Sequence, residues 1–304
     1  GYIQYHRNGG KIIEEEDFFI VIEIGHWLIN RDAGLDDYLD AKISNPSDGY
    51  RKALELYEIL DPTKFRKELK YNFYASRGLA YAKLRQTPSA REDFSDAIRI
   101  DDSSSDLNYN FASMDAQLGN FPLAIKGYKT ALVKYKEAET KANLNANEDF
   151  EVQVKEAIIY RDLGWAHLLL GMNKDNEPTS DGTRDFTSAI DYFNKITNSS
   201  NLRKESPGLF AIANVGKALA LFYSQGSTAG GIEIQNALSQ AGNTPVAQYA
   251  QGVIDGKGDS IFGIQNSISS LIFGNIVPHD LDADKTLDVF HGYFYCGGRS
   301  PRIQ

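Results

Sequence analysis

Small and aromatic residues recur at helical spacing in residues 71–102, with polar residues between them. The recurring residues are Tyr74, Gly78, Tyr81, Ala90, Phe94 and Ala97. Because residues three or four apart share one face of a helix, the pattern predicts two helices packed against each other. The small residues let the helices approach closely, and Pro88 with Ser89 predicts the start of the second helix.

The same pattern occurs a second time, one fixed interval further along the chain. Four residues of the first hairpin have counterparts 34 residues later, at Ala112, Ala124, Tyr128 and Ala131. A fixed interval of this length indicates helical hairpins that stack in series. We therefore predict a second hairpin from Asp106 onward, with Gly119 ending its first helix. Residues 71–136 hold the best copies of the repeat.

Weaker copies of the pattern flank this pair of hairpins, so about five repeats are predicted within residues 14–240. The first copy is marked by Val21, Ile24, Gly25 and Leu28, followed by a helix at residues 50–60. The fourth copy is marked by Tyr160, Leu163, Gly164, Phe186 and Ala189. The fifth copy is marked by Val215, Gly216, Leu219, Gly230, Ile234 and Ala237.

The interval is longer before the fourth copy. Gly164 lies 52 residues after Ala112, where the repeat predicts 34. Residues 134–141 and 148–157 are rich in helix formers, and residues 143–147 have the composition of a turn. We therefore predict two extended helices that form a hairpin projecting from the stack.

The two ends of the chain lack the repeat. Residues 1–13 are predicted to be a polar arm, and residues 241–304 a helical cap with an irregular tail. Within the cap, residues 246–254 suit one helix, and Ile261–Phe273 suits an amphipathic helix that covers the exposed end of the repeats. The expected fold is all-α, a helical-repeat solenoid with an atypical cap.

Composition restricts the class of partner. The chain has 304 residues, 42% of them hydrophobic, and a net charge of -9. These values suit a folded protein and argue against a nucleic-acid partner, because phosphate binding needs clustered Lys and Arg. Cys296 is the only cysteine, which excludes an internal disulfide and a cysteine-based zinc site and leaves the redox compartment open.

No stretch of the sequence predicts a membrane-spanning helix, which needs about 20 apolar residues. Residues 18–29 are too short and too polar, and residues 260–279 carry amide and hydroxyl side chains. Peripheral membrane binding by Ile261–Phe273 stays an alternative. We expect a soluble protein, either cytoplasmic or stromal, or else lumenal or periplasmic after removal of a leader, since the chain begins at Gly1 and is either processed or trimmed.

With these repeats, residues 14–240 resemble a tetratricopeptide-repeat protein. The resemblance implies a right-handed superhelix whose first helices line a concave groove that grips an extended peptide or a partner helix. It implies groove positions at Asn72, Leu79, Lys83, Tyr109, Asn110, Ser113, Arg161, Trp165, Asn214 and Lys217. Members that clamp a terminal carboxylate use Lys and Asn at places held here by Ala75, Leu79, Tyr109 and Ser113.

Arg161 and Trp165 lie one helical turn apart and can form one patch. Both residue types are enriched at the energetic centres of protein interfaces, which favours contact with a partner. The alternative is that Trp165 fills space against the next repeat while Arg161 pairs with a neighbouring acid.

No catalytic or metal-binding pattern is recognisable, so we predict no catalytic residue, no metal and no cofactor. The histidines show no regular ligand spacing and are His6, His26, His167, His279 and His291. His167 occupies a packing position and is predicted to be structural. Asp280, Asp282 and Asp284 begin like a calcium loop, but Lys285 and His291 replace its required glycine and glutamate.

Two functional hypotheses follow. The first is a non-catalytic scaffold, accessory or assembly subunit of a multi-subunit complex, including a photosynthetic or other organellar or bacterial assembly, that binds proteins through the groove and the C-terminal tail. The second is an all-helical enzyme or small-ligand-binding protein with a C-terminal pocket that gathers His279, Asp280, Asp282 and His291. A closed polar cavity would favour the second hypothesis.

Overall fold

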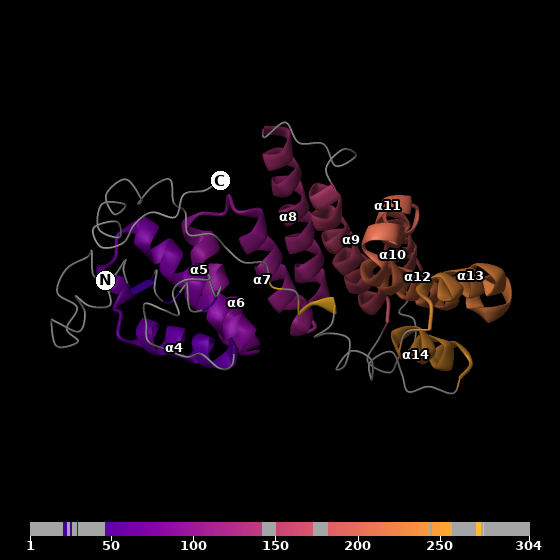
Figure 1. Ribbon diagram of the computed structural model, residues 1–304, viewed down its shortest axis with the longest axis horizontal. Coiled ribbons are helices and arrows are strands. Elements are labelled where there is room, and N and C mark those ends of the chain that lie inside the picture. Colours follow the sequence, from indigo (N-terminus) through magenta and orange to yellow (C-terminus); the bar gives the residue numbers. More distant parts are fainter. Residues whose placement is uncertain are drawn as a thin grey trace, which may run out of the picture. The chain divides into compact units, whose positions relative to one another are not determined.

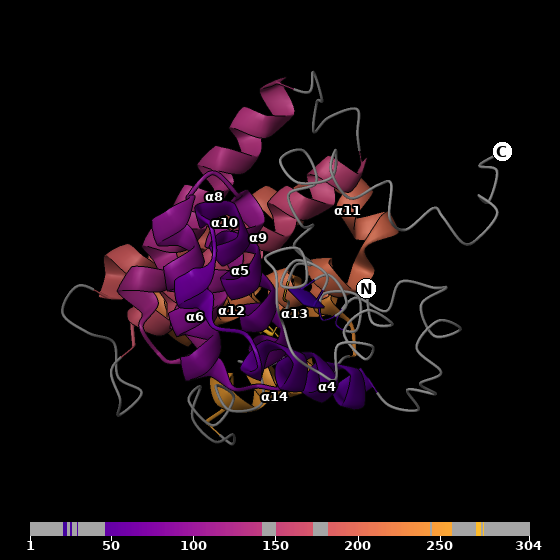
Figure 2. The same ribbon diagram turned by 90° about the vertical axis from the view of Figure 1, so that its left-hand side faces the viewer.

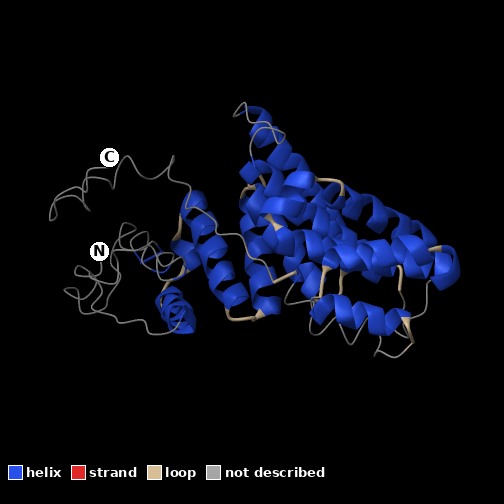
Figure 3. Cartoon of the chain, turned by 45° about the vertical axis from the view of Figure 1, so that its right-hand side comes forward, coloured by secondary structure: helices blue, strands red, loops and turns tan. Residues whose placement is uncertain are grey.

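The computed structural model describes residues 21, 22, 25, 29, 46–141, 150–172, 182–243, 245–256, 272–274 and 276. Helices make up the regular structure of these residues, and no strand occurs among them (Figures 1 and 3). The all-α fold predicted from the sequence is therefore confirmed for the described part of the chain. The chain divides into two compact units, residues 1–102 with 278–304 and residues 103–277. This division falls between the second and third expected repeats.

In the first unit, the continuously described residues 46–102 form three helices and a short 3-10 helix. Their bounds are Pro46–Glu58 for α4, Pro62–Lys64 for η1, Lys67–Lys83 for α5 and Thr87–Ile100 for α6. Helix α5 packs against both α4 and α6. Phe73 meets Tyr57 and Phe65 edge to face, with ring centroids 5.8 and 5.5 Å away. Gly78 lies so close to Phe94 that a Cβ would stand 2.7 Å from the ring, which is the close approach that the small residue predicts.

The second unit contains three pairs of consecutive helices that pack together, α7 with α8, α9 with α10, and α12 with α13. Helix α12 also packs against α9, α10 and α14, so it joins the later helices into one body. The bounds are Ser105–Gln117 for α7, Phe121–Lys141 for α8, Phe150–Leu170 for α9, Gly182–Thr197 for α10, Ser200–Glu205 for α11, Pro207–Ala229 for α12, Gly231–Ala241 for α13 and Pro245–Ile254 for α14.

The turn between α5 and α6 has the same geometry as the turn between α7 and α8. In both, the three N–H groups that follow the first helix donate to carbonyls of its last turn, which satisfies groups that a helix end leaves unpaired. Arg85 and Gly119 take the left-handed conformation in these turns, with φ of 60° and 78°. The predicted helix end at Gly119 is confirmed, and the two positions are 34 residues apart.

The extended helices predicted before Gly164 are present. Helices α8 and α9 are each 21 residues long, and the C-terminal part of α8 extends past its neighbours in two views (Figures 1 and 2). Lys136 Nζ on α8 lies 2.9 Å from Glu156 Oε1 on α9, which joins the two helices. Residues 142–149, where the turn is predicted, lie outside the described residues.

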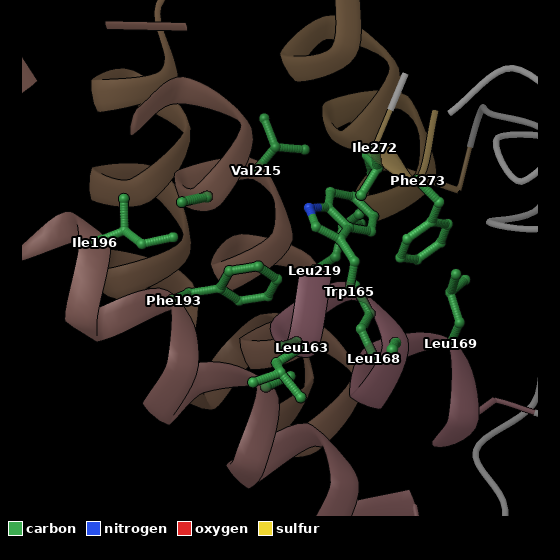
Figure 4. Packing of buried hydrophobic residues seen from close by; sticks show 14 of the residues in the cluster. Leu163, Trp165, Leu168, Leu169, Phe193, Ile196, Val215, Leu219, Ile272 and Phe273 are labelled. Carbon is green, nitrogen blue, oxygen red and sulfur yellow. The ribbon is translucent and has the colours of Figure 1, made fainter. Parts of the chain in front are cut away.

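Phe193 of α10 lies at the centre of the second unit. Its ring lies between Gly164 of α9 and Gly216 of α12, where an added Cβ would stand 2.5 and 2.3 Å from ring atoms. Trp165 meets the same ring edge to face, with centroids 6.0 Å apart, and Figure 4 shows this part of the core. Three helices therefore converge on one aromatic ring.

Several smaller predictions can be compared with the helices. Helix α14 matches the helix predicted at residues 246–254. Helix α4 overlaps the helix predicted at residues 50–60, but it begins earlier, at Pro46, and ends earlier, at Glu58. Helix α11 is an additional element whose first turn is capped by Ser199, since its Oγ accepts from Leu202 N–H at 3.2 Å. The N-terminal arm and the tail lie outside the described residues. No described helix is long and apolar enough to cross a membrane.

Candidate functional site

Residues 272 and 273 lie against α7 and α9 and are held there by two hydrogen bonds. Arg161 Nη2 donates to the carbonyl of Ile272 at 2.8 Å, and Gln117 Nε2 donates to the carbonyl of Phe273 at 2.8 Å. Ile272 is helical and residues 273–274 form a turn, so both carbonyls belong to the group that a helix end leaves unpaired. Side chains from two helices thus cap one helix end.

Apolar packing completes this contact. Ile272 and Phe273 are fully buried and belong to the same core cluster as Trp165, Leu168 and Leu169 of α9. Figure 4 shows the Trp165 ring beside Ile272, and the Phe273 ring near Leu169. Burial of an Ile or Phe side chain contributes about 1.5–3 kcal/mol, so the apolar pair supplies much of the attachment.

We use the name segment-binding face for the surface formed by Gln117, Arg161, Trp165, Leu168 and Leu169. It combines two hydrogen-bond donors, Gln117 and Arg161, with an apolar floor, the surface formed by Trp165, Leu168 and Leu169. The two residues that it holds, Ile272 and Phe273, combine bulky apolar side chains with backbone carbonyls that accept from the two donors.

A buried polar network fixes Arg161 in place. Its Nε lies 2.7 Å from Asp162 Oδ1, and Tyr109 Oη donates to Asp162 Oδ2 at 2.5 Å. Next to this group, Tyr128 Oη donates to Ser113 Oγ at 3.1 Å, and Ser113 Oγ donates to the Tyr109 carbonyl at 3.0 Å. The network links α7, α8 and α9 directly behind the donor that holds Ile272.

The charges of this network are balanced. Burial would lower the pKa of Arg161, but the adjacent Asp162 carboxylate raises it overall, so the guanidinium stays charged. Burial raises the pKa of Tyr128, and the Asp162 charge adds to the effect, so this hydroxyl stays protonated. Because Asp162 neutralises Arg161, the Nη2 donor suits a neutral carbonyl such as that of Ile272. A carboxylate there would bring an uncompensated second negative charge into a buried site.

Most of the ten groove residues implied by the sequence are buried. Lys83 and Lys217 are half-buried, and burial lowers the pKa of Lys83. The eight residues with at most 8% exposure are Asn72, Leu79, Tyr109, Asn110, Ser113, Arg161, Trp165 and Asn214. Their side chains are used inside the fold, so in this conformation they are not open to a partner.

The structure brings three of these residues to the buried network, Tyr109, Ser113 and Arg161. Trp165 is fully buried and Arg161 pairs with Asp162, which matches the packing interpretation of this pair. Asn214 Nδ2 donates to the Phe210 carbonyl one turn earlier in α12. Asn72 and Leu79 are buried in the first unit.

Sequence reasoning missed the residues that complete the contact, namely Gln117, Asp162, Ile272 and Phe273. Ile272 and Phe273 close the amphipathic helix that was predicted to cover the end of the repeats. The structure instead places them against α7 and α9. Residues 261–271 of that predicted helix lie outside the described residues, and so does the membrane alternative that rests on them.

Two buried polar atoms near this region have no hydrogen-bond partner in the described structure, Trp165 Nε1 and His167 Nε2. The other ring nitrogen of His167, Nδ1, lies 3.0 Å from Asp185 Oδ1, and the ring stacks on Tyr192 with centroids 5.7 Å apart. Burial lowers the pKa of His167 against the opposing effect of Asp185. These contacts fit the predicted structural role of His167.

The pocket of the enzyme hypothesis lies outside the described residues, since they do not include residues 277–304. The same holds for His6, His26 and Cys296. Within the described ranges, no group of three or more potential metal-ligating side chains comes together.

Comparison of the chain with models of protein families, with curated proteins and with solved structures finds no match. A functional assignment therefore has to start from the structure, and above all from the contact between residues 272–273 and the segment-binding face.

Proposed function

We propose that this chain is a non-catalytic scaffold or accessory subunit with tetratricopeptide-like helical repeats, and that it holds a segment of a partner protein on the segment-binding face. One observation carries the proposal. The face already holds a short piece of polypeptide, residues 272–273, by capping two backbone carbonyls and burying two apolar side chains. Recognition of this kind reads main-chain groups and apolar volume, which is how helical-repeat surfaces bind proteins.

Other features support a partner-binding role. Packed helix pairs and a 34-residue interval between equivalent turns fit a repeat protein. The long α8–α9 pair adds surface beyond the neighbouring helices (Figure 1).

The test is affinity capture of the full-length chain from its native source, followed by cross-linking and native mass spectrometry. We expect a protein partner in fixed stoichiometry. The matched control is Ile232→Ala on α13, because Ile232, at 81%, is the most exposed large apolar side chain among the described residues and lies outside the segment-binding face. The control should retain the partner. Loss of the partner in this variant, or the absence of any stoichiometric partner, would contradict the proposal.

A further inference from the structure

We propose that residues 272–273 are a built-in competitor, and that the partner is a protein helix ending in two adjacent bulky apolar residues that displaces them from the segment-binding face. This inference rests on the proposed function, because it names the chemistry of the partner and the contact that regulates access.

The chemistry of the bound segment defines the partner. The last carbonyls of any helix lack internal partners and carry the negative end of the helix dipole. Arg161 and Gln117 offer two N–H donors at the positions where the carbonyls of Ile272 and Phe273 lie. Any helix that ends in two bulky apolar residues can present the same two carbonyls and fill the same apolar floor.

Charge restricts the partner further. The guanidinium of Arg161 is compensated by Asp162, which is fully buried. A terminal carboxylate or an acidic side chain on this face would be an unpaired buried charge, which is strongly unfavourable. The partner segment is therefore neutral at the two residues that enter the face.

Attachment gives the built-in segment an advantage that can be estimated. Residues 257–271 connect α14 to Ile272, and a short connection of this kind gives an effective concentration in the millimolar range. A face occupied by its own segment for all but about 1% of the time binds a partner about 100-fold more weakly than an open face. Removing the built-in anchor should therefore strengthen binding.

Because residues 272–273 compete with the partner, substitutions in these residues and substitutions in the segment-binding face have different effects on partner binding. A change in the segment weakens only the built-in contact, so it strengthens partner binding. A change in the face, such as Gln117→Met, weakens the built-in contact and the partner contact by similar factors. These two effects cancel while the built-in segment is present, and only an opened face reveals the loss. A simple structural role for residues 272–273 does not produce this pattern.

The experiment uses the full-length chain and a fluorescent peptide of residues 261–276 as the probe, with binding followed by anisotropy. We expect the double variant Ile272→Ala and Phe273→Ala to bind the peptide at least tenfold more tightly than the wild type. Gln117→Met removes this donor without adding a charge. It should leave the wild-type affinity nearly unchanged, but in the double variant, here called the opened variant, it should weaken binding by about three- to tenfold, which corresponds to the loss of one hydrogen bond. Circular dichroism verifies that each variant is folded.

Equal peptide binding by the opened variant and the wild type would overturn the inference. If the double variant does not fold, Phe273→Leu gives the same test, because it keeps most of the apolar volume and must still bind the peptide more tightly than the wild type. A wild-type dimer that forms with rising concentration and is lost in the opened variant would identify a second copy of the chain as the occupant, against a separate partner. Peptide binding without any captured partner contradicts the proposed function alone, so the two failures are distinguishable.

Discussion

Phe193 lies between two glycines, and this arrangement makes a sharp prediction about Gly216→Ala. The added Cβ would lie 2.3 Å from Phe193 Cζ, whereas carbon atoms in favourable contact are about 3.5–4.0 Å apart. The ring would have to move by about 1.2 Å to reach that separation. It cannot move freely, because Gly164 on the opposite helix stands equally close, with 2.5 Å to its own ideal Cβ.

The magnitude follows from two opposing terms. Overpacking of a core costs about 1–3 kcal/mol, while replacing glycine by alanine inside a helix gains about 1 kcal/mol. We expect Gly216→Ala to lower the free energy of unfolding by up to about 2 kcal/mol. The control is Gly208→Ala in the same helix, where nothing lies within 4 Å of the added Cβ. This control should be neutral or slightly stabilising.

The assay is urea unfolding followed by tryptophan fluorescence. Trp165 meets Phe193 edge to face, and the chain has two tryptophans, so a Trp27→Phe background makes Trp165 the only indole reporter. Adding Phe193→Leu to Gly216→Ala should make the two changes less harmful together than their sum, because the smaller side chain makes room for the Cβ. The reasoning is refuted if Gly216→Ala unfolds at the same urea concentration as Gly208→Ala.

Three further predictions concern the turn, the histidine and the buried ion pair. Arg85→Gly should stabilise the first unit by about 0.5–1 kcal/mol. A residue other than glycine in the left-handed conformation costs about 1–2 kcal/mol, and the greater flexibility of glycine in the unfolded chain offsets part of the gain from removing this cost. A lower urea midpoint than that of the wild type would contradict the prediction. The lowered pKa of His167 means that the unfolded chain takes up the proton first, so stability should fall as pH drops below about 6.5, by up to about 1.4 kcal/mol per pH unit. His167→Gln should flatten that dependence in urea titrations across this range, and an unchanged slope would refute the assignment. Asp162→Asn should destabilise the second unit by about 3–5 kcal/mol because it leaves the buried Arg161 charge uncompensated, and a thermal melt equal to the wild type would contradict this.

The helices of the best repeats were predictable because their cause is local. Small residues at helical spacing and a glycine at a helix end act within a few residues, and the structure shows both at Gly78 and Gly119. The weaker fourth repeat was harder. Its markers include Gly164 and Phe186 but not Phe193, whereas the structure packs Phe193 on Gly164 and Phe186 on Gly171. The longer connection before α10 shifts which turns of the two helices face each other.

The contact at the segment-binding face could not be predicted from the sequence. Arg161 and Ile272 are 111 residues apart in the chain, and Gln117 and Phe273 are 156 residues apart. The hydrogen-bonded groups of Ile272 and Phe273 are backbone carbonyls, which every residue has, so no residue type marks them. Groove positions taken from a repeat pattern also assume an open face, whereas here the chain's own residues cover it.

The occupied face has a kinetic consequence. If residues 272–273 must leave before a partner enters, binding becomes a two-step process in which an opening event precedes the encounter. The observed association rate would then rise with partner concentration only until it reaches the rate of opening, and would be constant beyond that. A plateau in stopped-flow traces would measure how often the chain releases its own helix end, and Phe273→Ala would raise or abolish that plateau.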